Sequence, residues 1–425
     1  MMSRLTRALS HRNYRLFFAG QTVSLVGTWL TRVATSWLVY RLTKSELLLG
    51  VTGFAGQIPL LILAPFAGVY VDRWNRHRVL VVTQILSAVQ SLVLAVLALM
   101  NLITVAEVIG LQVIQGVINA FDTPARQAFV VEMVDDRADL PNAIALNSAM
   151  FNGSRIVGPS VAGIIIALVG EGWCFMIDAI SYIAVILSLL AMNVPARQIV
   201  RSGAHLMEEL KSGFRYVYGF APVRELLTNV ALISLLGMPY AVLMPVFAAT
   251  VLHGGAHTLG ILMTSVGAGA LCGTAYLASR HTVVGLGKVI VASTLMLSAG
   301  LIVFSLSHSL WLSLAALPFV GAGMMLQSSS SNTILQTVVT EDLRGRVMAF
   351  YSVAVLGTQP IGSLIGGIVA DRIGAAHTIL IGAIGCVLAG LWFAYRRPLL
   401  AQYVRPIYIE RGILPPLEET SLPAA

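Results

Sequence analysis

Charged side chains are scarce in this 425-residue chain. Asp, Glu, Lys and Arg together make up 11% of it, whereas 57% of the residues are hydrophobic. A soluble domain carries roughly 25% charged residues, so this chain has too few polar side chains to cover a water-soluble core. The composition therefore excludes a soluble globular protein and favours a protein that is surrounded by lipid.

Cysteine and the common catalytic motifs are also scarce or absent. Cys174, Cys272 and Cys386 are scattered in apolar runs, which excludes a disulfide framework. The chain has no His-Glu-x-x-His, no Gly-x-Ser-x-Gly and no Gly-Lys-Ser/Thr phosphate loop. His253 and His257 are too few donors for a metal site. We therefore expect neither metal nor cofactor, and a membrane-embedded enzyme or sensor is disfavoured.

Long apolar runs fill most of the chain. A bilayer core needs about 20 apolar residues per helix, and each run reaches that length. The sequence thus predicts an all-α membrane protein with twelve transmembrane helices in two six-helix, pseudo-symmetric halves. The expected spans are 14–40, 46–71, 79–100, 104–127, 142–169 and 173–193 in the first half, and 226–251, 257–279, 286–307, 310–335, 346–370 and 376–395 in the second.

Lys and Arg are unevenly distributed between the two sides of this topology. Of 27 such residues, 21 lie in or beside the termini and the even-numbered connections, and three lie in odd ones. The positive-inside rule then places both termini in the cytoplasm. The formal net charge of +8 is explained by this bias, so we expect no nucleic-acid partner. The basic start of the chain is interpreted as a retained signal-anchor.

The chain divides into five segments by composition. A cytoplasmic N-terminus (1–13) precedes the first bundle (14–194), and a linker (195–225) leads to the second bundle (226–397) and a tail (398–425). In the linker, apolar residues at helical spacing predict an amphipathic helix on the inner membrane face, with an ordinary solvated linker as the alternative. These residues are Leu206, Leu210, Phe214, Val217 and Tyr218. The proline-containing tail is expected to be disordered.

Polar side chains at helical spacing mark several spans. Residues three and four apart share a helix face, so each set forms a stripe that must face protein or water. The residues expected to line a substrate cavity are Gln21, Ser24, Thr28 and Arg32 in the first span, Gln112, Gln115 and Asn119 in the fourth, Asn152 in the fifth, and Gln327 and Asn332 in the tenth. The alternative is that these groups hold helices together.

Ionisable side chains within spans are costly in lipid and usually functional. Asp122, Asp178, Arg32 and Arg155 are therefore the candidates for proton coupling. Asp122 leads among them because it continues the polar face of the fourth span. The alternative for Asp122 is a permanent pair with Arg126, one turn on, that only fastens the inner end of that helix.

Two further sequence elements suggest moving parts. The inner loop after the second span carries Gly68, Asp72, Arg73, Arg76 and Arg78, and with Arg126 it is our candidate inner gate. Its alternative role is a plain topological anchor.

The second element is Gly158-Pro159 followed by Gly163 in the fifth span. Proline removes one backbone hydrogen bond and glycine permits close helix approach, which predicts a kinked gating helix or simply a packing kink.

With these elements in view, the chain resembles the major facilitator superfamily over about residues 10–397. The inner loop is similar to that family's Gly-x-x-x-Asp-Arg-x-Gly-Arg-Arg motif, with Asn75 and His77 as departures. Gly158, Pro159 and Gly163 are similar to its antiporter motif, which implies efflux. A further departure is Gln112, which stands where an arginine is usual.

Within the superfamily, three segments resemble a bacterial branch of enterobactin-exporter-like and drug-exporter proteins. They are Phe121–Arg126, Arg155 with Gly158-Pro159, and Gly345–Met348.

The function expected from these features is proton-coupled export of small amphiphilic or hydrophobic molecules, drug- or siderophore-like, by alternating access. The alternative keeps the fold but moves lysophospholipid or another lipid. The expected partners are the substrate, membrane lipid and protons, and we expect a monomer.

Overall fold

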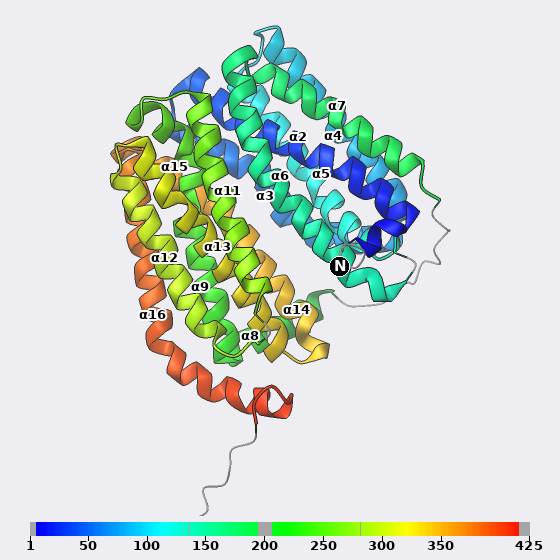
Figure 1. Ribbon diagram of the computed structural model, residues 1–425, viewed down its shortest axis with the longest axis vertical. Coiled ribbons are helices and arrows are strands. Elements are labelled where there is room, and N and C mark those ends of the chain that lie inside the picture. Colours follow the sequence, from blue (N-terminus) through cyan, green and yellow to red (C-terminus); the bar gives the residue numbers. More distant parts are fainter. Residues whose placement is uncertain (1–5, 135, 194–205, 281, 416–425) are drawn as a thin grey trace, which may run out of the picture.

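The computed structural model describes residues 6–134, 136–193, 206–280 and 282–415, and helices dominate it (Figure 1). The first part of the chain forms η1 (Arg7–Ser10), α2 (Arg12–Thr43), α3 (Glu46–Arg73), α4 (Arg76–Leu99), α5 (Val105–Val130), η2 (Arg137–Asp139), α6 (Leu140–Val169) and α7 (Glu171–Leu190). The second part forms α8 (Leu206–Gly219), α9 (Ala221–Gly237), α10 (Pro239–Val246), η3 (Phe247–Val251), α11 (Ala256–Ala278), α12 (Leu286–Leu306), α13 (Leu310–Val338), α14 (Glu341–Ser352), η4 (Val353–Gly357), α15 (Thr358–Ile373) and α16 (Ala375–Glu410).

Eleven helical segments of the described chain are long and apolar enough to cross a membrane. They coincide with eleven of the twelve expected spans, which confirms the all-α membrane fold. The remaining expected span is α2, a 32-residue helix that carries Arg32 and Arg41 and is not among the eleven. It packs against α6 and α7 within the first bundle, so the count of twelve rests on its position rather than its hydropathy.

Local sequence signals explain where several helices begin. Thr104 and Glu107 form a reciprocal capping box at the start of α5, which satisfies two otherwise unpaired backbone donors. The side chain of Asn75 accepts from the backbone N–H of Arg78 and caps α4. The basic loop before α4 is thus also a helix-start signal.

Two single-residue connections reveal the internal repeat. Gly170 joins α6 to α7 with φ of 91°, and Gly374 joins α15 to α16 with φ of 85°. Residues with a side chain avoid this left-handed region, so each half uses glycine for the same sharp turn between its last two helices.

The two ends of the molecule differ in charge. We call the end with Arg12, Arg15, Arg73 and Arg78 the basic end, and the end with Gly170 and Gly374 the distal end. Figure 1 shows the two helix bundles meeting toward the distal end and diverging toward the basic end.

The buried apolar residues show how the bundles join. One cluster contains residues of both bundles and includes Phe175, Leu243 and Phe304 near the distal end and Leu30 in the middle of α2. At the basic end the bundles have separate clusters, one around Tyr14 and Phe129 and another in the second bundle. The halves therefore share a core at the distal end only.

Helix α8 follows residues 194–205, which lie outside the described chain. Its Ser212 hydroxyl accepts a hydrogen bond from Arg346 of α14 at 2.8 Å. Phe214 and Tyr218 are exposed and their rings stack with centroids 6.3 Å apart. The helix expected in the linker is therefore present, with exposed aromatic side chains suited to a membrane surface.

The expectation of a disordered tail from Pro398 onward is wrong for its first part. Helix α16 continues to Glu410, and Leu400 and Tyr408 are buried against the second bundle. Proline ended the predicted helix, but packing of the apolar side chains offsets the lost hydrogen bonds. Residues 416–425 lie outside the described chain.

Candidate functional site

The polar stripe of α5 is largely engaged with neighbouring helices. Gln112 donates to the Thr35 hydroxyl of α2 at 3.3 Å. Gln115 donates to Ser87 of α4 and to Asn119, both at 3.2 Å. These side chains are partly exposed, so the stripe joins helices and also borders accessible space.

Asp122 is held by three partners at the junction of α4 and α5. Its Oδ1 accepts from Thr83 at 3.0 Å and from Gln84 at 2.8 Å, and its Oδ2 pairs with Arg126 at 3.2 Å. The carboxylate is buried and its charge is compensated. This geometry matches the helix-fastening alternative for Asp122, with Arg126 as its partner.

Asp178 has a different environment. It is 1% exposed, and its Oδ2 accepts from Thr31 of α2 at 2.8 Å and from Ser91 of α4 at 2.7 Å. Its Oδ1 is buried and has no hydrogen-bond partner in the described part of the chain. A buried carboxylate without a cation is costly, so Asp178 is the better candidate for a group that takes up a proton.

A glycine on α2 makes room for this carboxyl group. A Cβ on Gly27 would lie 2.7 Å from Asp178 Oδ1, too close for any side chain there. The corresponding position after the other single-residue turn, eight residues beyond Gly374, is Gly382 in α16. There, a Cβ would lie 2.2 Å from the Leu236 carbonyl oxygen of α9. The two halves therefore differ at this repeated position: the first half has a buried acid there, and the second half has a glycine packed against α9.

The residues predicted to line the cavity separate into two groups. Gln21, Ser24, Asn152 and Gln327 are buried. Gln327, for example, donates to Asn229 of α9 at 3.1 Å and thereby joins two helices, so in this conformation the group does not border accessible space.

Thr28 and Arg32 of α2 are exposed, and Asn332 of α13 is partly exposed. Because α2 contacts α6 and α7 of its own half and also α10 and α11 of the other half, the helix that carries Thr28 and Arg32 lies at the boundary between the bundles.

Arg32 and Arg155 are close enough to each other to interact electrostatically. The guanidinium of Arg32 lies over the Trp29 ring, 4.7 Å from its centroid, and Arg155 is near Tyr240 of α10. Neither arginine forms an ion pair with a carboxylate of the described residues.

The residues of the antiporter-type motif bring α6 into close contact with α2 on one side and α11 on the other. A Cβ on Gly158 would lie 2.3 Å from Trp29 Cβ of α2. Across the boundary between the halves, a Cβ on Gly260 of α11 would lie 2.5 Å from the Pro159 carbonyl oxygen and 3.0 Å from Gly163 Cα. Gly158 thus joins α6 to its own bundle, while Pro159 and Gly163 join it to the other.

The contacts described for the predicted inner gate lie within the first half. A Cβ on Gly68 would meet nothing within 4 Å, so no neighbouring helix packs closely against this glycine in this conformation. Arg76 pairs with Glu132 at 2.8 Å in its own half, and Arg73 and Arg78 are exposed. The side chain of Asp72 lies outside the described set.

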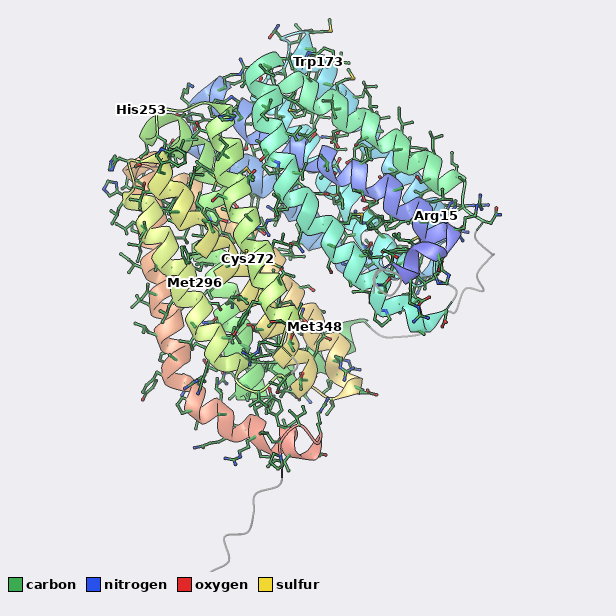
Figure 2. All side chains as sticks on the ribbon, viewed as in Figure 1. Arg15, Trp173, His253, Cys272, Met296 and Met348 are labelled. Carbon is green, nitrogen blue, oxygen red and sulfur yellow. The ribbon has the colours of Figure 1, made fainter. Side chains whose placement is uncertain are left out.

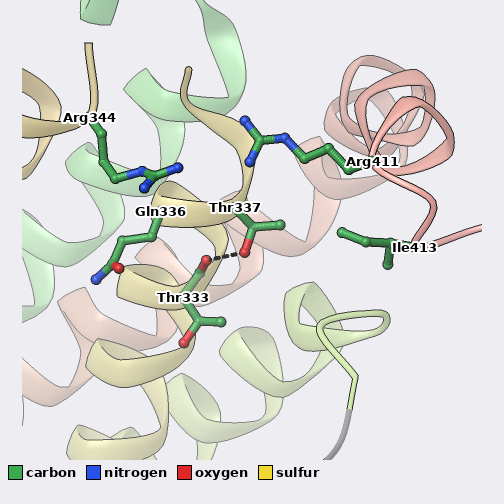
Figure 3. Close-up of a pocket in the computed structure, with 6 residues that line it drawn as sticks. All are labelled: Thr333, Gln336, Thr337, Arg344, Arg411 and Ile413. Atoms are coloured by element: carbon green, nitrogen blue, oxygen red, sulfur yellow. Dashed lines mark hydrogen bonds between the residues drawn. The ribbon is translucent and has the colours of Figure 1, made fainter. Parts of the chain in front are cut away.

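Two pockets flank this central region. One, of about 650 Å³, lies at the basic end of the second bundle, where Arg344 and Arg411 point toward the Gln336 and Thr337 end of α13 (Figure 3). The other, of about 520 Å³, lies at the distal end between Trp37, Glu171 and His257. Figure 2 places Trp173 and His253 toward that end, and Cys272 in the middle of the molecule on α11. Neither pocket contains the central arginines.

A buried acid of the second half was not identified from the sequence. Glu225 at the start of α9 is 8% exposed, pairs with Arg396 at 3.3 Å and accepts from Trp392 at 3.2 Å. Its position one residue before an expected span was the available signal. Because Glu225 joins α9 to α16 with its charge paired, the arrangement is structural.

Comparison with known proteins decides the family. The sequence profile described as "transmembrane secretion effector" matches residues 5–402, nearly the whole chain. The chain belongs to this family of major facilitator superfamily exporters. Membership of an exporter family agrees with the efflux that the antiporter-type motif of α6 implied.

Curated relatives of this exporter are consistent with that assignment. The staphyloferrin A transporter of Staphylococcus aureus is 25% identical over 90% of this chain and 96% of the relative. The multidrug efflux pump Tap of Mycolicibacterium fortuitum is 28% identical, covering 88% and 93%. Macrolide efflux protein A of Streptococcus pyogenes is 22% identical, covering 87% and 93%.

Solved structures share the exporter's fold. A bacterial homologue of the human lysosomal transporter Spinster, inward-facing and unoccupied, aligns with a TM-score of 0.71 at 13% identity, covering 93% of this chain and 98% of its own. A bacterial homologue of ferroportin in an inward-facing state also aligns at 0.71, with 14% identity and coverage of 90% and 98%. At these identities the likeness concerns the fold alone.

Proposed function

We propose that this exporter moves small amphiphilic or hydrophobic molecules out of the cell by alternating access, in exchange for protons. One observation carries the proposal: the halves share a single apolar core at the distal end and have separate cores at the basic end. Rocking one half against the other would exchange which end is closed. The exposed Thr28 and Arg32 lie where such a movement would alternate access.

The proton part of the proposal rests on Asp178. Its carboxyl group is buried, unpaired with any cation of the described residues, and bonded to α2 and α4 through Thr31 and Ser91. A proton on Oδ1 would remove an isolated charge from a site that solvates it poorly. Since α2 also carries Arg32, protonation of Asp178 acts on a helix that borders the space between the halves.

Transport assays in inside-out vesicles test this function directly. With a proton gradient that is acidic inside the vesicle, fluorescent amphiphiles should accumulate inside, and a protonophore should abolish the accumulation. The assay should include anionic, neutral and cationic amphiphiles, because the relatives' names span a siderophore and drugs. Accumulation that persists undiminished with the protonophore would contradict proton exchange.

We further propose that the basic end is cytoplasmic, in a bacterial inner membrane. In a Cys272→Ser background, Ser212→Cys in α8 should resist an impermeant maleimide in intact cells and react in inside-out vesicles. Ser309→Cys, at the distal start of α13, should show the opposite pattern. Labelling of Ser212→Cys from outside intact cells would reverse the orientation.

A further inference from the structure

Two arginines occupy the middle of the protein where a bilayer is least able to solvate charge. Arg32 lies within α2 and Arg155 within α6, each more than ten residues from either end of its helix. An arginine at the bilayer centre costs at least about 2.5 kcal/mol on insertion scales. Two arginines that also repel one another are therefore unfavourable unless another group compensates them.

The protein's own compensation is incomplete. The Arg32 guanidinium stacks on Trp29, which solvates a cation through the ring face but leaves its charge in place. Arg155 has Tyr240 nearby, which is neutral as a phenol. Among the described residues no carboxylate pairs with either arginine, whereas Arg126, Arg76, Arg41 and Arg396 each have an acidic partner.

The two arginines also lie where the halves separate. The Arg155 carbonyl oxygen would be 3.1 Å from a Cβ on Gly267 of α11, and one turn further out Ser160 bonds Thr264 of α11 at 2.7 Å. One turn toward the basic end, Phe151 is 49% exposed and a Cβ on Gly153 would meet nothing within 4 Å. Arg155 thus marks the closed end of the accessible space.

An apolar surface adjoins the arginines. Phe151 and Trp29 meet edge to face, with centroids 6.3 Å apart, and the Phe151 ring is exposed. A cationic pair beside exposed aromatic surface suits a molecule with an anionic group and an apolar body. Guanidinium recognises carboxylate and phosphate through paired charge-assisted hydrogen bonds.

We propose that Arg32 and Arg155 bind the anionic group of the transported molecule, so that the preferred substrates are amphiphilic anions. This inference rests on the proposed export function and narrows its substrate class. The shared chemistry, an oxyanion on an apolar body, occurs in soluble carboxylates and in anionic lysophospholipids. Tyr240, contributed by the second half, places a polar group at the same site from across the boundary.

Binding of a matched pair of probes tests the proposal. The probes are a dansyl-labelled amphiphile ending in a carboxylate and its methyl ester, with energy transfer from tryptophan as the signal in purified protein. Wild-type protein should bind the carboxylate about 10- to 100-fold more tightly than the ester, the range of a charge-assisted hydrogen bond. Arg32→Gln and Arg155→Gln should each reduce this preference, and the double variant should remove it.

Further variants separate charge recognition from folding. Arg32→Lys and Arg155→Lys should retain part of the preference because they keep the charge. Arg41→Gln on the same α2 helix, whose guanidinium is paired with Glu171, should keep it in full. A wild-type protein that binds both probes equally, or a double variant that still prefers the carboxylate, would overturn the proposal.

Two further experiments complete the test: competition by a lipid for the binding site, and transport of the probes into vesicles. Lysophosphatidylglycerol competing with the carboxylate probe, with the same arginine dependence, would support the anion site and identify lipid as one source of the anion. Vesicles that accumulate neutral amphiphiles while the binding preference is absent would retain the export function and reject the anion site. Vesicles that accumulate none of the probes would reject the export function itself.

Discussion

Asp178→Asn is expected to abolish proton-driven accumulation of substrate in inside-out vesicles while leaving substrate exchange down a concentration gradient intact. Asparagine has nearly the same shape and can still accept from Thr31 and Ser91, the two partners of Asp178 Oδ2. It cannot gain or lose a proton. If Asp178 carries the proton, the variant keeps its binding site and its movement but loses the link to the gradient.

The matched control is Asp122→Asn in the same half. Asp122 is equally buried but is paired with Arg126 and bonded to two further side chains. Its replacement weakens this hydrogen-bond network, so the free energy of unfolding should fall by about 1–3 kcal/mol and the melting temperature should fall with it. Proton-driven accumulation should continue. Accumulation by Asp178→Asn against a substrate gradient would exclude Asp178 as the proton carrier. Loss of accumulation in Asp122→Asn alone would assign that role to Asp122.

Gly260→Leu is expected to lower efflux at least about fivefold by preventing closure of the distal end. A Cβ at this position would already lie 2.5 Å from the Pro159 carbonyl oxygen, so a leucine side chain cannot fit while α6 and α11 are in contact. Overpacking of this kind costs about 1–3 kcal/mol. Applied to one conformation, that cost shifts the population ratio by about 5- to 150-fold toward the state with an open distal end.

Accessibility measures this shift independently of transport. In a Cys272→Ser background, Thr28→Cys should react from the basic end in the parent protein. With Gly260→Leu added, it should react less from that end and more from the distal end. Gly110→Leu is the matched control, because a Cβ at Gly110 would meet nothing within 4 Å. Unchanged labelling and efflux in Gly260→Leu would show that contact between α6 and α11 is not part of the transport cycle.

The fold was predictable because its signals are local. The spans followed from apolar runs of sufficient length, and the capping residues and glycine turns that the structure shows at helix ends are local features too. The exception at Pro398 is informative: the sequence showed a helix breaker, but Leu400 and Tyr408 are buried against the second bundle and the helix continues. Whether tertiary packing overrides a local preference cannot be decided from the local preference itself.

The site was predictable as a set of residues but not as a set of roles. The spacing of Gln112, Gln115, Asn119 and Asp122 placed them on one helix face, and the structure agrees. Sequence alone ranked Asp122 above Asp178 because Asp122 continues that face. The hydroxyl and amide partners of the two acids come from α2 and α4, far away in the chain, so only the pair of Asp122 with Arg126 within α5 could be predicted from the sequence.

Composition, hydrophobic run length and the spacing of polar residues by themselves determined that this chain is an all-α membrane protein with a few charges placed inside its spans, because those properties depend on neighbouring residues and on the solvent. The tertiary structure alone decided whether the charges that lack a partner on their own helix are compensated. Arg126 has Asp122 one turn away on α5, but Arg32 and Arg155 have only aromatic rings and each other nearby, and the Asp178 carboxylate accepts hydrogen bonds only from hydroxyl groups among the described residues. The cost of a buried charge is set by groups within a few ångströms in space, and that proximity exists only once the helices have packed.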